Sequence, residues 1–401
     1  MLRVTPYYGS SRRKNEPDAP CCTLIEYAGT KVLVNVGWSV NLALPDDLEP
    51  DCIVLTDSTL QSIGGLPQWW WKRYREKKDP STSGDPPPLI PIYATFPTVK
   101  MGQMTLYDQH AALCMDGKQP PYSLEAVDEC VGMITSIKYS QHMSAPPNQQ
   151  LTLTAYGAGH TVGNAFFVLQ RPHDDTVVVV TSPKLNISQE LVLDRSPLLQ
   201  TAKSPDVLLV YPGYQPPLLQ TTSKNNNNNS SIPRSVSSAS ARLTESVLTV
   251  LRGDGHVLLP TDASGRCLEL LWQLNRHWET QRLQATYTLV WLAPLAHNVY
   301  EFARSQLEWM RLPFGDTTQH PLEFSAVTRM TSATELDALL LKTNNPTCVV
   351  ASGLSLDGTF VVLHERHEWI EIGSCIHPSH PYLSLHDSRP RPRCFTPLCR
   401  K

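Results

Sequence analysis

The sequence predicts an α/β protein built in layers, and three observations lead to this fold class. Short apolar runs bounded by glycine and proline, typical of strands, fill the first half of the chain. Strands and helices alternate after about residue 244, a pattern that favours a parallel sheet. Between the two halves lies a stretch rich in asparagine and serine, which cannot bury a core. We therefore expect two α/β units.

The first unit begins with strands and then mixes helices with strands. A helix is expected after the Gly64-Gly65-Leu66-Pro67 turn and extends to Arg75, and another follows Ser123, which is a good N-cap. The fully apolar run 207–211 is typical of a buried, parallel strand. In chain order, the expected strands are 23–27, 31–36, 52–56, 89–94, 151–155, 165–169, 176–180 and 207–211, and the other expected helices are 99–114 and 124–134.

The second unit alternates regularly. Its longest expected helix, 264–278, carries leucines and a tryptophan at helical spacing. The turn Gly253-Asp254-Gly255 has no lysine or second glycine cluster and is therefore no phosphate loop. The other expected elements are helices 244–251 and 299–310 and strands 256–260, 287–292 and 347–352.

Composition limits the function. Of 401 residues, 41% are hydrophobic and 18% charged, and the formal net charge is −3. This balance argues against strong, non-specific binding of nucleic acid, which requires a basic face. The 10 cysteines form no CxxC pair, and no long apolar run occurs. We expect a soluble protein of a reducing, intracellular compartment.

Four groups of sequence words carry a resemblance to a known family. They are Asn35-Val36-Gly37-Trp38 with 51–56 and 63–67; 92–97 with Lys100-Met101-Gly102-Gln103-Met104; Ala158-Gly159-His160-Thr161-Val162-Gly163; and 251–258 with 262–270 and 301–310. In this order they resemble the metallo-β-lactamase/β-CASP family, and within it the subunit 2 proteins of the cleavage and polyadenylation specificity factor. The resemblance covers about residues 20 to 363.

The resemblance implies an αββα sandwich with an inserted β-CASP α/β domain. We expect the first part of the metallo-β-lactamase-like domain at residues 1–205 and the β-CASP domain at 206–365, with a disordered insertion at 220–241. Residues 366–401 are expected to be an unstructured or aberrant tail. Because the resemblance fades near Gly358, the sandwich is expected to be incomplete, either in a fragment or through a faulty last segment.

Active members of the family bind two zinc ions through an HxHxDH loop and further His and Asp ligands, which lowers the pKa of the bridging water to about 7. Alignment from Leu66-Pro67 places Asp57, Thr59, Gln61 and Ser62 at the loop's ligand positions. His160 stands at the next histidine position. Thr181 and Tyr211 stand where the resemblance implies acidic residues. We expect a degenerate site that holds no metal or other cofactor.

The resemblance implies a nuclear, non-catalytic scaffold of the pre-mRNA 3′-end cleavage machinery. Its partners would be the zinc-dependent endonuclease subunit, other subunits of that complex and, mainly through the complex, pre-mRNA. Two alternatives remain open at this point. One is an active RNA hydrolase with an atypical metal site around Asp57 and His160, and the other is the inactive β-CASP subunit of the Integrator complex.

Two further segments contain residue types that suit a binding function. The stretch 69–75 mixes three tryptophans with cations and would suit stacking on single-stranded RNA, although an amphipathic helix with inward tryptophans is the more frequent outcome. The tail contains cysteines and histidines whose spacing fits no standard zinc finger: Cys375, His377, His380, Cys394 and Cys399.

Overall fold

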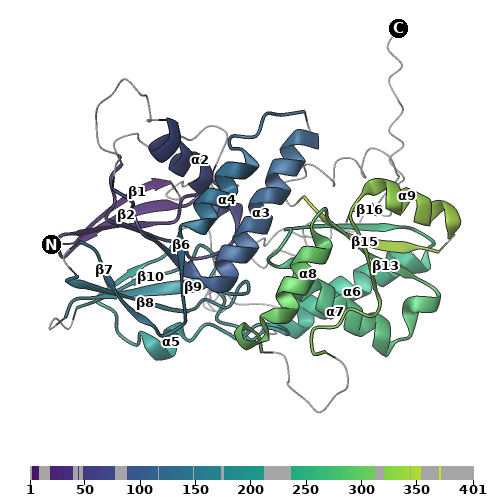
Figure 1. Ribbon diagram of the computed structural model, residues 1–401. Helices are drawn as coiled ribbons and strands as arrows, with labels where there is room; N and C mark the ends of the chain where they lie inside the picture. Colours follow the sequence, from purple (N-terminus) through teal and green to yellow (C-terminus); the bar gives the residue numbers. More distant parts are fainter. Residues whose placement is uncertain are drawn as a thin grey trace, which may run out of the picture.

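The computed structural model describes residues 2–8, 19–38, 44, 48–76, 88–115, 117–147, 149–172, 176–211, 236–311, 320–343, 345–353 and 370–371. Two units lie side by side (Figure 1). The first is a sandwich of two sheets with helices, and the second is built on a third sheet. Within these residues, no helix has both the length and the apolar character needed to cross a bilayer.

The first sheet has six strands in the order β1-β2-β3-β4-β5-β6. Strands β1 to β3 pair in antiparallel fashion, and β3 to β6 are parallel. The strands are β1 (Leu2–Tyr8), β2 (Cys22–Tyr27), β3 (Thr30–Val34), β4 (Cys52–Val54), β5 (Ile92–Thr95) and β6 (Ile134–Ile137).

The second sheet has five strands in the order β11-β10-β9-β8-β7. Only the β10–β11 pair is parallel. The strands are β7 (His142–Ala145), β8 (Leu151–Gly157), β9 (Ala165–Gln170), β10 (Val177–Val180) and β11 (Val207–Leu209). An apolar core that includes Val34, Val54, Leu153 and Phe167 joins the inner faces of the two sheets, because alternate strand residues point to the same face.

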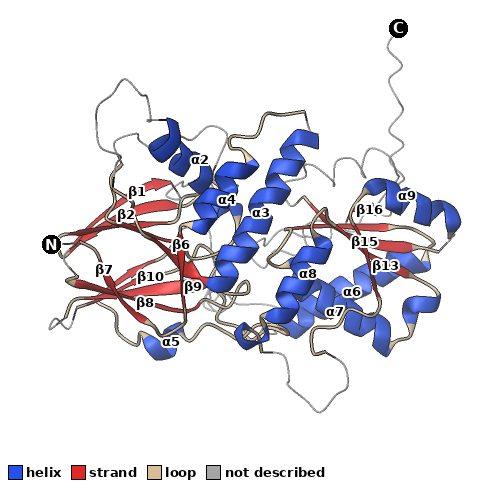
Figure 2. Ribbon diagram, in the orientation of Figure 1, coloured by secondary structure: helices blue, strands red, loops and turns tan. Residues whose placement is uncertain are grey.

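Helices cover the outer faces of this sandwich (Figure 2). The larger group packs on the first sheet through Ile63, Leu66, Trp70 and Val127. It comprises α1 (Leu60–Ile63), α2 (Leu66–Trp71) with a π-helical turn η1 (Lys72–Glu76), α3 (Phe96–Met115) and α4 (Leu124–Gly132). The short helix α5 (Leu198–Thr201) lies on the second sheet. The predicted N-cap is confirmed, since Ser123 Oγ accepts from Ala126 N at 3.2 Å.

The second unit contains a sheet with the strand order β14-β13-β15-β12-β16. All of its strand pairs are parallel, as predicted. Its main core lies against the helices on one face of this sheet, and α9 packs on the other. The elements are α6 (Val236–Arg252), β12 (Val257–Thr261), α7 (Cys267–Thr280), η3 (Leu283–Ala285), β13 (Thr288–Leu292), α8 (Ala296–Ser305), η4 (Leu307–Trp309), β14 (Val327–Met330), α9 (Ala333–Lys342), β15 (Thr347–Ser352) and β16 (Ile370–Glu371).

Two expectations need correction. Strand β11 is parallel, as predicted, but not buried: it lies at the edge of its sheet, and Leu208 and Val210 are 46% and 53% exposed. The expected disordered insertion 220–241 is also too long, because helix α6 already begins at Val236. Serine and alanine there continue into an amphipathic helix whose leucines pack on the core, and this packing outweighs weak local propensity. The rest of the insertion and the predicted tail lie outside the described residues, apart from the two residues of β16.

Candidate functional site

The loop after β4 is held by backbone contacts to the segment after β3. Val36 N donates to Ser62 O at 2.7 Å, and Gly65 N donates to Val36 O at 2.9 Å. Gly37 is required at this crossing, because a Cβ there would lie 2.1 Å from the Gln61 carbonyl oxygen. The loop expected to carry the metal ligands is therefore present in full, with its backbone fixed.

Asp57 lies at the centre of a buried group of hydroxyls. Its side chain is 1% exposed. Oδ1 accepts hydrogen bonds from the backbone N–H of Thr59 at 2.9 Å and from the Thr59 hydroxyl. Oδ2 accepts from Ser62 Oγ at 3.0 Å and from Ser182 Oγ at 3.0 Å. We call these four residues the Asp57 cluster. Every donor in it is neutral.

The segment after β10 enters the cluster one residue later than the sequence predicted. Thr181 turns away, since its backbone N–H and its hydroxyl both donate to Leu209 O, at 3.0 and 3.1 Å. Ser182 instead reaches Asp57 and also accepts from Asn164 Nδ2 at 2.8 Å. Val178 and Val180 face the core between the sheets while Val179 faces outward, so the same alternation directs residue 182 inward.

Two other predicted positions, His160 and Gln61, are also buried. His160 is 4% exposed in the loop between β8 and β9, and its carbonyl accepts from Arg266. Gln61 is 7% exposed, and its carbonyl accepts from Cys21 N at 2.8 Å. Burial raises the pKa of Tyr211 far above its usual range, with Cys21 as a further cause.

A buried lysine lies close to the cluster. Lys184, which follows Ser182 by two residues, is 8% exposed. Burial strongly raises the pKa of the Cys21 thiol; the Asp57 carboxylate raises this pKa further, and the Lys184 ammonium lowers it. The charges that act on the Cys21 thiol are thus those of the Asp57 carboxylate and the Lys184 ammonium, in a region where the family resemblance implied metal ions.

This donor set does not fit a pair of zinc ions. Zinc sites in proteins use three or four thiolate, imidazole or carboxylate ligands. Across the described part of the chain, no three His, Cys, Asp or Glu side chains gather closely enough to hold a metal ion. The hydroxyls of Thr59, Ser62 and Ser182 donate hydrogen bonds to Asp57 and thereby occupy the carboxylate.

Residues 24–213 match the family model of the metallo-beta-lactamase superfamily domain. The first unit therefore has the metallo-beta-lactamase fold. Together with the double sheet, the match confirms the predicted fold class.

Three curated relatives extend the similarity to most of the chain. Cleavage factor two protein 2 of Schizosaccharomyces pombe is 28% identical over 86% of this chain. The probable cleavage and polyadenylation specificity factor subunit 2 of Drosophila melanogaster is 26% identical over 86%, and the subunit 2 of Oryza sativa subsp. japonica is 25% identical over 90%. The chain spans 40%, 43% and 45% of their respective lengths. The predicted resemblance is thereby confirmed.

A second buried polar group joins the metallo-beta-lactamase domain to the second unit. Arg266, at the start of α7, forms an ion pair with Glu190, which is 5% exposed. Glu269 on α7 accepts from the backbone N–H groups of Leu191 and Val192, at 2.7 and 2.9 Å. Burial raises the pKa of Glu269 to about 7; Glu190 acts in the same direction, and Arg266 opposes it. Sequence reasoning missed this group, whose members lie more than 70 residues apart.

The tryptophan-rich stretch forms, in part, the amphipathic helix with inward tryptophans that is the more frequent outcome. Trp70 is buried against the first sheet, as an amphipathic helix requires. Arg73 lies over the Trp69 ring at 5.7 Å and pairs with Glu49 at 3.6 Å, and Arg75 pairs with Glu129 at 2.6 Å. Arg73 is itself only 10% exposed, so this cation does not extend into water as it would in a simple amphipathic helix. The cysteines and histidines of the tail lie outside the described residues.

Proposed function

We propose that this chain is a non-catalytic subunit of the nuclear machinery that cleaves and polyadenylates pre-mRNA 3′ ends. The names of its relatives support the process, and the Asp57 cluster supports the absence of catalysis. The chain spans less than half of the length of each of those relatives. Its membership of the complex and its role there are therefore part of this proposal.

The Asp57 cluster carries the proposal. A catalytic metal pair needs imidazole, thiolate or carboxylate ligands, with open positions for water and phosphate. Here Thr59, Ser62 and Ser182 give neutral hydroxyls, and their protons point to the carboxylate oxygens that a metal would need. The hydrogen bonds compensate the buried charge without an ion, since carboxylates accept strongly from several donors.

The proposed role is that of a scaffold. We infer that the chain binds the zinc-dependent endonuclease subunit and contacts pre-mRNA mainly through the complex. In this assignment residues 1–205 are the first part of the metallo-beta-lactamase domain, residues 206–365 are a β-CASP domain, and the tail takes no part. Asp57, Thr59, Gln61, Ser62, His160 and Thr181 are positions of a former metal site.

Metal analysis tests the absence of catalysis. The chain is purified without chelator and its zinc content is measured by mass spectrometry, alongside cleavage of a labelled pre-mRNA 3′-end substrate. We expect far less than one zinc per chain and no cleavage. Two zinc ions per chain, with cleavage that Asp57→Ala abolishes, would overturn the proposal in favour of an active hydrolase.

Affinity capture from nuclear extract tests the partner. We expect the endonuclease of the 3′-end cleavage complex to co-purify with the tagged chain. Co-purification of the Integrator endonuclease alone would assign the chain to that complex instead. Capture of neither endonuclease would contradict the scaffold role.

A further inference from the structure

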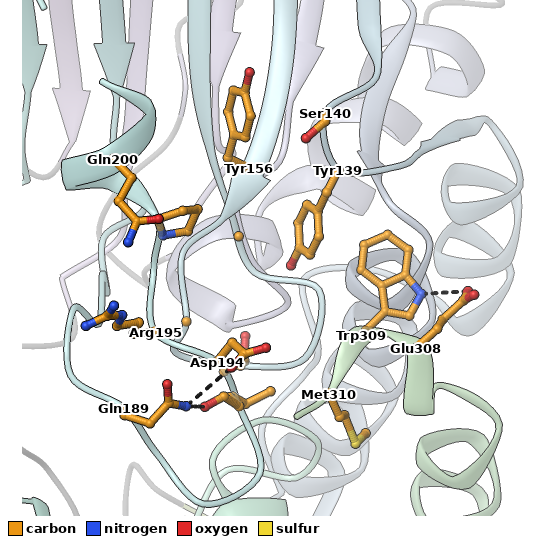
Figure 3. Close-up of a pocket in the computed structure, with 15 residues that line it drawn as sticks. Tyr139, Ser140, Tyr156, Gln189, Asp194, Arg195, Gln200, Glu308, Trp309 and Met310 are labelled. Carbon is orange, nitrogen blue, oxygen red and sulfur yellow. Dashed lines mark hydrogen bonds between the residues drawn. The ribbon is translucent and has the colours of Figure 1, made fainter. Parts of the chain in front are cut away.

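The cavity between the first and second units carries no excess charge. Its volume is about 560 Å³, and Figure 3 shows its aromatic and polar lining. This lining includes the carboxylates of Asp194 and Glu308 and the guanidinium of Arg195. Arg311 adds a second cation, 3.8 Å from Asp194. Because two cations balance two anions, the charges around this cavity favour neither an anionic nor a cationic ligand.

Two arginines of the second unit, in contrast, share one tyrosine ring. The guanidinium carbon of Arg329, on β14, lies 4.1 Å from the centroid of the Tyr300 ring, and that of Arg304, on α8, lies 5.5 Å from the same centroid. Tyr300 is 4% exposed, and its ring also meets Phe324, with centroids 5.4 Å apart. The negative face of an aromatic ring attracts a guanidinium. Tyr300 therefore holds both cations where α8 packs against β14.

The Arg329 guanidinium is held without the use of its hydrogen-bond donors. The residue is half-buried, and its side chain makes no hydrogen bond or ion pair with another described residue. Its Nε is buried without a partner, whereas its terminal nitrogens are not enclosed. A guanidinium carries five N–H donors in a rigid fork, and stacking on a ring leaves them available. Arg329 is thus ordered and still able to donate to a ligand.

Arg304 is engaged only weakly. Its Nη1 lies 3.7 Å from Glu301 Oε2, beyond hydrogen-bond distance, and the two side chains are 35% and 66% exposed, so solvent screens the pair. Arg304 Nε is also buried without a partner among the described residues. Trp291, the neighbour of Arg329 in the β13–β14 pair, is fully buried, and its indole N–H has no partner in the same part of the chain. Donors thus outnumber acceptors on this face of the sheet.

The arrangement suits an anion with several oxygens. Two guanidiniums against one ring repel each other, and one solvent-screened carboxylate offsets only part of their charge. Donors in folded proteins are nearly always paired, so a surface with this many unpaired donors is complementary to a ligand rich in acceptors. A carboxylate is satisfied by the fork of one guanidinium, whereas a phosphate dianion has three oxygens and can engage two. The geometry therefore favours phosphate over carboxylate.

We propose that Arg304 and Arg329 form a binding site for a phosphorylated side chain of a partner protein. The phosphate accepts hydrogen bonds from the terminal nitrogens of both guanidiniums, and Tyr300 positions them. Arginine clusters recognise phosphorylated segments in this way. A nucleic acid is disfavoured, because its backbone requires a row of cations, whereas this chain has a formal net charge of −3 and α8 places Glu301 beside Arg304. The site goes beyond the proposed function and does not rest on it.

Fluorescence anisotropy with a fluorescein-labelled glycine–serine peptide that carries one phosphoserine tests the site. Its unphosphorylated twin, and a twin with glutamate in place of the phosphoserine, are measured beside it. We expect only the phosphorylated peptide to bind. Arg304→Gln should raise its Kd about tenfold, as the loss of one charge-assisted contact does. Arg329→Lys keeps a cation against Tyr300 but removes the planar fork, and should raise Kd about fivefold.

Arg276→Gln is the matched control. Arg276 is exposed on α7, and its guanidinium carbon lies 4.7 Å from the centroid of the Trp272 ring, so it is also an arginine stacked on a ring. Its replacement removes the same charge and should leave Kd unchanged. The phosphorylated peptide should raise the thermal midpoint of the parent chain and of Arg276→Gln but not that of Arg304→Gln, which separates loss of binding from loss of folding. Equal losses of affinity in Arg304→Gln and Arg276→Gln would overturn the site.

Three other results would contradict this inference. Equal binding of the glutamate twin would show that the arginines do not require a phosphate. Absence of binding of the phosphorylated peptide to the parent chain would remove the site. An oligouridylate that binds more tightly than this peptide, and that loses affinity in Arg304→Gln, would assign the arginines to nucleic acid. Affinity capture has a separate outcome, since a chain that joins no 3′-end complex can still bind the phosphorylated peptide.

Discussion

Ser182 Oγ lies 3.0 Å from Asp57 Oδ2, across 125 positions of sequence. This hydrogen bond connects the loop after β4 with the segment after β10, the two places where the resemblance implied metal ligands. A neutral donor thus links the two sheets of the sandwich at this point.

Replacing Asp57 tests the energetic role of its cluster. In Asp57→Asn the hydroxyls of Ser62 and Ser182 lose a charged acceptor, and the new amide N–H₂ lacks a buried acceptor. We expect a loss of about 2–4 kcal/mol in the free energy of unfolding, measured by urea titration. Asp254→Asn, in an exposed turn with φ of 59°, should change it by less than about 0.5 kcal/mol. Equal effects of both substitutions would contradict the structural role of the cluster.

The buried ion pair between the two units gives a second prediction. Arg266→Met leaves Glu190 buried without its cation, and we expect a loss of about 3–5 kcal/mol in unfolding free energy and faster cleavage of the 189–194 loop by protease. Arg304→Met breaks a 3.7 Å pair with Glu301 at the surface and should cost about 1 kcal/mol or less. A small effect at Arg266 would indicate that the units are held by apolar contacts alone.

The raised pKa of Glu269 predicts a pH dependence of stability. Burial raises this pKa from 4.5 to about 7, so between these values the folded chain binds more protons than the unfolded chain. Stability from this group is therefore complete below pH 4.5 and is lost as the pH rises through 7, by roughly 3 kcal/mol.

Glu269→Gln provides the comparison, since it removes the titrating group and keeps a hydrogen-bond acceptor. Urea titrations between pH 4.5 and 8 should show a flatter profile for this variant than for the parent chain. Glu245→Gln, on the exposed face of α6, should keep the parent profile. If the parent chain and Glu269→Gln gave the same profile of stability against pH, the Glu269 carboxyl would have the same pKa in the folded and the unfolded chain.

Substitutions at two glycines test the backbone crossing between the segment after β3 and the loop after β4. In Gly37→Ala the new Cβ would overlap the Gln61 carbonyl oxygen and Cys21 N, at 2.1 and 2.6 Å, so the loop after β4 must shift. We expect strong destabilisation, about 3 kcal/mol or more in urea titration. Gly132→Ala, in α4, meets nothing within 4 Å and should gain roughly 0.5–1 kcal/mol from helix propensity. A tolerated Gly37→Ala would mean that the crossing is loose.

Local signals predicted those elements whose boundaries depend on nearby residues. The cap at Ser123 predicted the start of α4, and short apolar runs predicted β8 to β10. Helix α9 was missed, although Ser332 and Glu335 form a capping pair in which Ser332 Oγ accepts from Glu335 N. This capping pair is visible in the sequence alone, so the start of α9 was predictable.

The candidate site was predictable only in part. The loop positions from Asp57 to Ser62 followed from the family resemblance, with the motif counted back from Leu66-Pro67. The contact of Ser182 did not, since it depends on which face of β10 is buried and on how two sheets stack. The contact between Arg266 and Glu190 likewise arises from packing between units. A local sequence pattern does not encode such long-range contacts.

Val192 and Leu193 belong to the first half of the chain by position but to the core of the second unit by packing, in the cluster that includes Leu268 and Trp272. If the chain were cut near residue 205, the second half would expose part of its apolar core, and the first half would expose Val192 and Leu193 together with Met101 and Val162 of the same cluster. Neither half should remain monodisperse when produced alone. Co-production of both halves would instead permit them to reassociate through this cluster.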